Sequence, residues 1–202
     1  LIGGSIAKAL RRVYPQIKLY AVSGHLSTII NAHKAGVIEN DRLLALEELS
    51  DMDYIFLCTP VQQNLTYLKQ LKTILTPGTI LTDVGSVKGD IHRAVIEEGL
   101  EEYFIGGHPM AGSEKTGFDA ATPYLLENAY YVITPTAKTE PTQTERFRAL
   151  VSSLGAIPLI MDYEQHDFAT ASISHLPHIM AYSLVNLIKK IDDPAETMKT
   201  IA

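Results

Sequence analysis

The 202-residue sequence contains no tryptophan, a single cysteine and no long hydrophobic segment. The cysteine, Cys58, stands in the apolar run YIFLCTP and has no second thiol with which to form an internal disulfide. We therefore expect a buried free thiol, which fits a reducing cytoplasm. The apolar runs are too short for a transmembrane helix, and no signal peptide is recognisable, so we expect no membrane partner.

The sequence also lacks a basic run, and its formal net charge is −6 at pH 7. Binding to nucleic acid phosphates requires positive charge, so we expect no nucleic acid partner. The remaining composition, 46% hydrophobic and 20% charged residues, is typical of a soluble globular protein.

Apolar runs and helical patterns alternate along most of the chain. We expect strands over residues 16–22, 53–60, 79–86, 103–109, 130–135 and 157–162, and helices over residues 3–14, 26–36, 63–75, 88–100 and 142–155. Continuous apolar strands that alternate with helices are typical of an α/β protein with a mostly parallel sheet covered by helices on both faces.

From Tyr163 onwards the pattern is helical only, so we place a domain boundary there. Residues 1–162 form the first domain, and residues 163–202 form the start of an all-helical second domain. The chain opens on a helix start and stops inside the helical pattern AETMKTIA, so we expect a fragment of a longer protein.

Three of the expected strands end in short polar or glycine-containing stretches. These are Thr59-Pro60, DVGS at residues 83–86, and GGHPMAG at residues 106–112. In a doubly wound sheet, ligands bind in the crevice at the carboxyl ends of the strands. We therefore expect the three stretches to line one crevice, with Thr59 and Pro60 near a cofactor and His108 as a proton acceptor.

Ser86 and Lys88 follow the strand at residues 79–86. Serine readily caps a helix N-terminus, and a capping serine at this edge of the sheet would also face the cofactor. Lys88 would either bind a substrate carboxylate or be a solvated residue of the next helix.

The opening LIGGS resembles the end of a G-x-G-x-x-G dinucleotide fingerprint. Gly3 would be its third glycine, which allows a helix to pack closely on a strand, and Leu1, Ile2 and Gly3 would lie near the cofactor. The acidic residue that binds the ribose in such proteins lies about 20 residues further on, where this sequence has Ser23. The choice between NAD and NADP therefore stays open, and Ser23 is equally well interpreted as a turn residue.

His175 and His178 in SHLPH are three residues apart, so they share a helix face with Tyr182. Two histidines at this spacing can hold a metal, but catalytic zinc usually has three protein ligands and no third one follows. We therefore expect no metal and interpret both histidines as substrate contacts. Pro177 is expected to bend or start the helix.

Five motifs in this order and spacing resemble the prephenate dehydrogenase family: LIGGS, TDVGSVK, GGHPMAGSEKTG, ENAYYVITP and SHLPH. The resemblance covers essentially the whole chain, and GGHPMAGSEKTG is its most specific part. It implies a Rossmann-type domain, here without its first strand, joined to a helical substrate domain that forms a homodimer. It also implies oxidative decarboxylation of prephenate to 4-hydroxyphenylpyruvate in tyrosine biosynthesis, with NAD or, alternatively, NADP. Some members of the family use arogenate.

The resemblance also implies roles for individual residues. His108 would accept the hydrogen bond of the substrate ring hydroxyl, and Ser86 would lie near that histidine and the nicotinamide. Glu114 would lie at the mouth of the site, and His178 near the substrate side chain. The first two fingerprint glycines and an arginine expected beyond residue 202 are absent, so we expect this chain alone to be an incomplete enzyme.

Two other functions remain open from the residues themselves. One is another Rossmann reductase, of the hydroxyacid or imine type, which would lack a histidine in the glycine loop. The other is a non-enzymatic dinucleotide-sensing module, which would give no reason for His108, Ser86 and His178 to converge.

Overall fold

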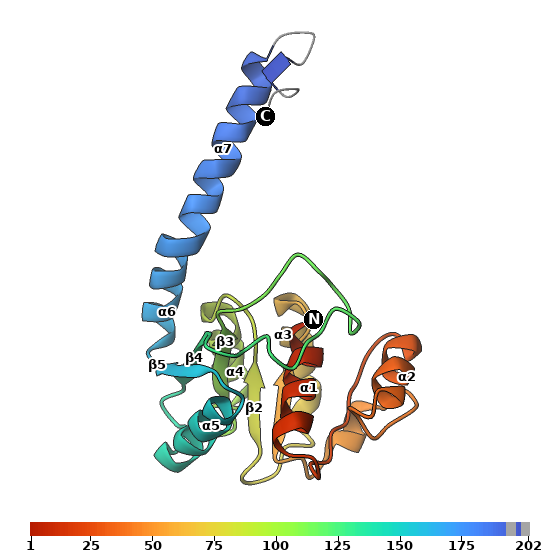
Figure 1. The fold of residues 1–202 in the computed structure, drawn as a ribbon. Helices are drawn as coiled ribbons and strands as arrows, with labels where there is room; N and C mark the ends of the chain where they lie inside the picture. Colours follow the sequence, from red (N-terminus) through yellow and green to blue (C-terminus); the bar gives the residue numbers. More distant parts are fainter. Residues whose placement is uncertain (193–196, 199–202) are drawn as a thin grey trace.

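The computed structural model describes residues 1–192, 197 and 198. An α/β domain is followed by a helical arm that extends away from it (Figure 1). The expected helical pattern at residues 195–202 lies largely outside the described residues.

The strands form a mostly parallel sheet, as the sequence predicted. Their bounds are β1 Tyr54–Leu57, β2 Ile80–Asp83, β3 Ile105–Pro109, β4 Tyr130–Pro135 and β5 Ile157–Ile160. β1 pairs with β2 and β4 with β5 in parallel, and a parallel bridge from Leu81 to Phe104 joins β2 to the start of β3. The pair β3–β4 is antiparallel. Because β1, β2 and β3 run parallel to one another, all three end at the same edge of the sheet.

Helices cover both faces of the sheet, which confirms the predicted fold class. The helices of this domain are α1 Ile2–Val13, α2 Leu26–Lys34, the 3₁₀ turn η1 Leu46–Leu49, α3 Val61–Leu71, α4 Gly89–Glu98 and α5 Pro141–Ser153. Ile6 of α1 and Phe147 of α5 share one apolar cluster with Ile133 of β4. Leu68 of α3 and Ile91 of α4 share a second cluster, with Leu81 of β2.

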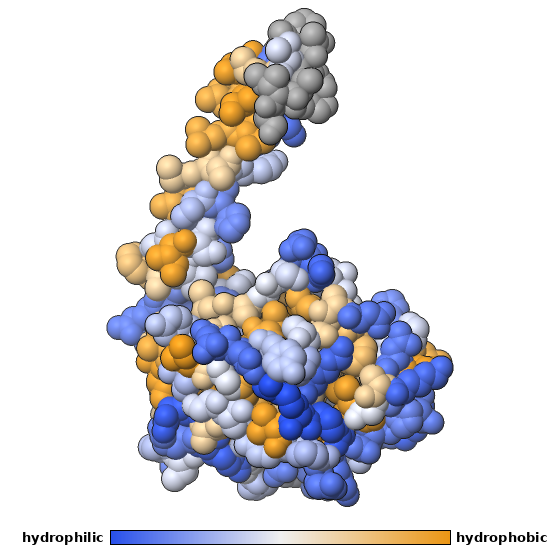
Figure 2. Space-filling view, in the orientation of Figure 1, coloured by the Kyte–Doolittle hydropathy of each residue, from blue (hydrophilic) through white to orange (hydrophobic). Residues whose placement is uncertain are grey.

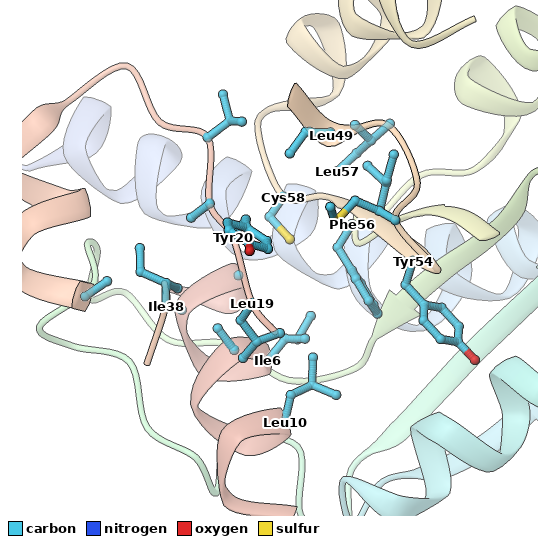
Figure 3. Close-up of a pocket in the computed structure, with 18 of the residues that line it drawn as sticks. Ile6, Leu10, Leu19, Tyr20, Ile38, Leu49, Tyr54, Phe56, Leu57 and Cys58 are labelled. Carbon is cyan, nitrogen blue, oxygen red and sulfur yellow. The ribbon is translucent and has the colours of Figure 1, made fainter. Parts of the chain in front are cut away.

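The prediction of a strand at residues 16–22 is wrong, because the structure has no strand there. The segment is connected to its neighbours on one side: the Leu19 carbonyl accepts from the Glu39 amide, and the Asn40 side chain binds both backbone groups of Ala21. On the side towards β1 a cavity of about 1660 Å³ separates the two (Figure 3). Alternating apolar residues make a strand only where a neighbouring strand completes the hydrogen bonds, and here none of the described residues does so.

The helical arm begins at Tyr163 and consists of α6 Tyr163–Thr170, the π-helical turn η2 Ala171–His175 and α7 Leu176–Ile191. The carboxylate of Asp162 caps it by accepting the amide hydrogens of Glu164 and Gln165. Pro177 lies in the first turn of α7, where its missing N–H is tolerated. The boundary between residues 162 and 163 coincides with this cap, and the division into two domains stays a prediction.

Every residue of α7 except Asn186 is exposed. Apolar side chains cover much of the surface of the arm (Figure 2). In the part of the chain that the structure describes, no helix has both the length and the apolar character needed to cross a membrane.

His92 is a buried polar residue of the core. Its ring stacks on Tyr163 with centroids 4.5 Å apart, and its Nε2 lies 2.9 Å from Thr134 Oγ1. Burial, helped by the charge of Lys88, lowers the pKa of His92 to about 4. The folded protein therefore holds a neutral imidazole between the α/β domain and the first turn of the arm.

We predict a specific loss of stability in acid. As the pH falls below 6.5, His92 is protonated in the unfolded chain, whereas in the folded chain it stays neutral until about pH 4. The free energy of unfolding therefore decreases between these two pH values. The full contribution is about 3 kcal/mol at 1.36 kcal/mol per pKa unit. Urea unfolding of wild type and His92→Gln at pH 7.5, 6, 5 and 4 measures it, and the variant should lose less stability on acidification. Parallel pH curves for the two proteins would contradict the assignment.

Candidate functional site

His108 stands at the carboxyl end of β3, at the edge where β1 and β2 also end. It is nearly buried, with 9% of its surface exposed. Burial lowers its pKa to about 4, and the nearby His166, Lys88 and His175 act in the same direction. At neutral pH His108 is therefore an uncharged imidazole that can accept a hydrogen bond.

Two residues of α6 that the sequence analysis missed hold His108 in place. His108 Nδ1 lies 2.8 Å from Nε2 of His166, and His166 Nδ1 lies 2.8 Å from Oδ1 of Asp167. The two rings meet edge to face at 78°. The sequence signal was present as the dipeptide His-Asp one turn into the arm, but nothing local indicated that it faces β3.

Asp167 also caps α4, the role expected of Ser86. Its two carboxylate oxygens accept the backbone amides of Lys88 and Gly89, each at 2.8 Å. Burial favours a higher pKa for Asp167, but these two hydrogen bonds and the one from His166 outweigh it and lower the pKa. Ser86 lies upstream of the cap position and is exposed. The prediction that Ser86 caps the helix is wrong, because the carboxylate from the arm already satisfies the helix end.

Lys88 is fully buried rather than solvated. Its ammonium forms an ion pair with Asp83 and donates to the Gly107 carbonyl at 2.8 Å. Burial lowers the pKa of Lys88, while the Asp83 carboxylate opposes that shift. With its charge used inside the protein, Lys88 is not placed to bind a substrate carboxylate, and the expectation of a solvated helix residue is wrong.

The adjacent glycines of GGHP allow β3 to pack closely within the protein. A Cβ at Gly107 would lie 2.6 Å from the Asp83 carbonyl oxygen, and one at Gly106 would lie 2.2 Å from Thr134 Oγ1. These two glycines are therefore required by packing within the protein, since protein atoms fill the space that side chains would need.

The large cavity contains most of the residues expected at the cofactor. It lies between α1, residues 16–24 and β1, with Ile6 and Leu19 on one side and Phe56 on the other (Figure 3). Its lining includes the expected cofactor residues Leu1, Gly3, Ser23 and Thr59. Ile2 instead packs against the core and Pro60 precedes α3, and neither lines the cavity.

Gly3 has the packing role that the fingerprint predicted. A Cβ on Gly3 would lie 2.9 Å from Cβ of Cys58, so only glycine lets α1 approach the end of β1 this closely. Cys58 also lines the cavity and is exposed. The expectation of a buried thiol is wrong, because the side of β1 that carries it faces the cavity rather than packed protein.

Ser23 is half-buried at the edge of the same cavity. Its hydroxyl accepts the backbone amide of His25 at 3.2 Å, as in a turn. This hydrogen bond supports the interpretation as a turn residue, and the role of Ser23 at a ribose stays a prediction.

The remaining expected substrate residues lie on the arm and on a loop. His175 is half-buried and contributes to the lowered pKa of His108. His178 is exposed, and its Nδ1 contacts the Ser174 carbonyl oxygen at 3.0 Å. Glu114 is exposed on the segment that follows β3. The roles of these three residues stay predictions.

No metal centre is evident. Among residues 1–192, 197 and 198, no three His, Cys, Asp or Glu side chains gather closely enough to hold an ion.

Two family models match nearly the whole chain. The model described as "Prephenate dehydrogenase, nucleotide-binding domain" matches residues 6–158, and "Prephenate dehydrogenase, dimerization domain" matches residues 162–202. A curated prephenate dehydrogenase of Bacillus subtilis is 36% identical over 188 residues, which cover 92% of this chain and 51% of the relative. The chain thus spans about half the length of the curated relatives that it matches first.

Two solved structures have the same fold. Prephenate dehydrogenase of Aquifex aeolicus, in complex with hydroxyphenyl propionate and NAD+, has a TM-score of 0.89 and 32% identity, covering 98% of this chain and 70% of that one. Arogenate dehydrogenase of Synechocystis has a TM-score of 0.86 and 36% identity, covering 100% of this chain and 72% of that one.

Proposed function

Because this chain belongs to the prephenate dehydrogenase family, we propose that the complete protein oxidatively decarboxylates prephenate to 4-hydroxyphenylpyruvate in tyrosine biosynthesis, with NAD as cofactor. The observation that carries the proposal is His108, a buried neutral imidazole at the strand edge where such folds bind ligands. It is held there by side chains from the arm, so both parts of the chain contribute to one site.

The chemistry assigns His108 a simple task. When the substrate carbon that bears the hydroxyl loses hydride, that oxygen becomes a carbonyl and must release its proton. A neutral imidazole within hydrogen-bond reach can accept the proton, and such acid–base assistance typically contributes about 10²–10⁴-fold in rate. Loss of CO₂ then leaves an aromatic ring, which drives the reaction forward.

Some of the groups that line the cavity suit a dinucleotide. The N-terminus of α1 opens there without a side-chain cap and without an acidic residue in its first turn, which favours a phosphate. Ser23 and Thr59 supply hydroxyl groups at the same cavity. NAD accepts the hydride when bound, and this chain's residues position it.

Arogenate is the second candidate substrate. It is supported by the 36% identity with the Synechocystis arogenate dehydrogenase, which equals the identity with the Bacillus subtilis prephenate dehydrogenase. Prephenate and arogenate differ in their side chain and share the ring hydroxyl, so His108 would act in the same way on either. A cytoplasmic location stays a prediction, and a dinucleotide-sensing module is the alternative if the complete protein turns over neither substrate.

We also propose that the arm forms a homodimer. One apolar stripe runs along the arm, and each of its side chains is exposed over more than half of its surface: Ile173, Leu176, Met180, Leu184, Leu187 and Ile191. The match to a dimerization domain supports a second copy of the chain as the cover of this stripe.

The first prediction from the proposed function concerns catalysis. His108→Asn in the complete protein should lower kcat by about 10²–10⁴-fold while changing the Kd for NAD little, since asparagine keeps a hydrogen-bonding group but cannot take the proton. Stopped-flow and steady-state assays with prephenate and with arogenate measure both quantities. His33→Asn on α2 is the matched control and should leave kcat unchanged. An unchanged kcat in His108→Asn would refute the proposed role.

The second prediction concerns the cofactor. Wild type should prefer NAD over NADP by a modest margin, because Ser23 offers the ribose a hydroxyl but does not repel a 2′-phosphate. Ser23→Asp should widen the margin by placing a carboxylate there. Ser27→Asp adds the same charge one turn further on, at a position outside the cavity lining, and should change the kcat/KM ratio less. Equal effects of the two substitutions would show that Ser23 does not face the ribose.

The third prediction concerns assembly. Leu184→Glu places a charge in the apolar stripe and should shift the protein from dimer to monomer in light-scattering measurements. Asn186 is two residues further, about 200° around the helix, so Asn186→Glu should leave the dimer intact. A wild-type monomer, or a dimer that tolerates Leu184→Glu, would contradict the interface.

A further inference from the structure

Three side chains form a continuous hydrogen-bonded series from the arm to the candidate proton acceptor. Asp167 Oδ1 contacts His166 Nδ1, and His166 Nε2 contacts His108 Nδ1, each at 2.8 Å. His166 is 1% exposed, so water does not replace these contacts readily. The far end of the series is also fixed, since Asp167 holds two backbone amides of α4.

The donors and acceptors along this series can be assigned starting from Asp167, whose carboxylate is a known acceptor. Asp167 has a lowered pKa, so its carboxylate is ionised and can only accept. His166 must therefore carry a proton on Nδ1. In its neutral form an imidazole carries only one ring proton, which leaves His166 Nε2 as an acceptor.

An acceptor at His166 Nε2 requires a donor opposite it. The nearer of its two partners is His108 Nδ1, at 2.8 Å, while the hydroxyl of Thr170 lies at 3.3 Å. His108 is neutral, so a proton on its Nδ1 leaves the other ring nitrogen, Nε2, with a free lone pair. The Lys88 ammonium is directed to other partners, the Asp83 carboxylate and the Gly107 carbonyl.

We propose that His166 is a positioning residue, which, with Asp167 behind it, holds His108 in the tautomer protonated on Nδ1, so that Nε2 accepts the proton of the substrate. The proposal rests on the proposed function for the identity of that substrate. The tautomer itself is a property of the protein alone. The same logic operates in the Ser-His-Asp triad, where loss of the orienting carboxylate costs about 10⁴ in kcat.

The ring protons can be observed directly. Two-bond ¹H–¹⁵N correlation spectra of the complete protein with labelled histidines, recorded at pH 8, distinguish the two tautomers of each histidine. The signals of His108 are those lost in His108→Asn. In wild type we expect the Nδ1-protonated form, and a wild-type His108 protonated on Nε2 would overturn the proposal whatever the variants do.

Two substitutions separate positioning from packing. His166→Gln retains a side-chain oxygen that can accept from His108 and should keep the Nδ1-protonated form and most of kcat. His166→Met fills a comparable space without that acceptor, so His108 should change to the Nε2-protonated form and kcat should fall on the order of 10²-fold, with KM for NAD within about twofold of wild type. Thermal unfolding verifies that both variants are folded.

The outcomes distinguish this proposal from the proposed function. His166→Met with an unchanged tautomer and unchanged kcat would overturn the positioning role. A complete protein inactive on both prephenate and arogenate would overturn the proposed function, and the tautomer spectra of wild type and His166→Met would still decide the present proposal.

Discussion

The buried ion pair between Lys88 and Asp83 is the constraint on which the site depends. Two charges out of water are stable only when paired and further hydrogen-bonded, and removing one partner of such a pair typically costs about 3–5 kcal/mol. Here the Lys88 ammonium and the Asp83 carboxylate also bind the carbonyl and the amide of Gly107. This arrangement fixes β3 against the end of β2, and His108 is the next residue of β3.

The same segment connects the sheet to the arm. The backbone amides of Lys88 and Gly89, which open α4, are satisfied by Asp167 from α6. The arm therefore docks through a helix N-terminus that would otherwise be incomplete, and this docking carries His166 to His108. Beyond α6 the arm leaves the α/β domain, and many apolar side chains on its surface are exposed (Figure 2).

The sequence predicted elements and strand ends well, because apolar runs and their glycine and proline boundaries are local signals. It placed His108, Gly3 and Thr59 at element ends where the structure has them, near the site or the cavity. It was wrong about residues 16–22, since local apolar character does not show whether a neighbouring strand is present. It was wrong about Ser86 because Asp167, about 80 positions further along the chain, caps α4 in its place. It was wrong about Lys88 because its ammonium pairs with Asp83 at the end of β2.

The sequence by itself determined the alternation of strands and helices, the start of an all-helical part at Tyr163 and the presence of a histidine at a strand end. These follow from periodicity and from residues within a few positions of each other. Only the tertiary structure decided that Asp167, not Ser86, caps α4, that Lys88 is an internal counter-ion, and that His166 stands behind His108. Each of these depends on the docking of α6 or on the pairing of strands, and no local pattern in the sequence encodes which buried polar groups will meet.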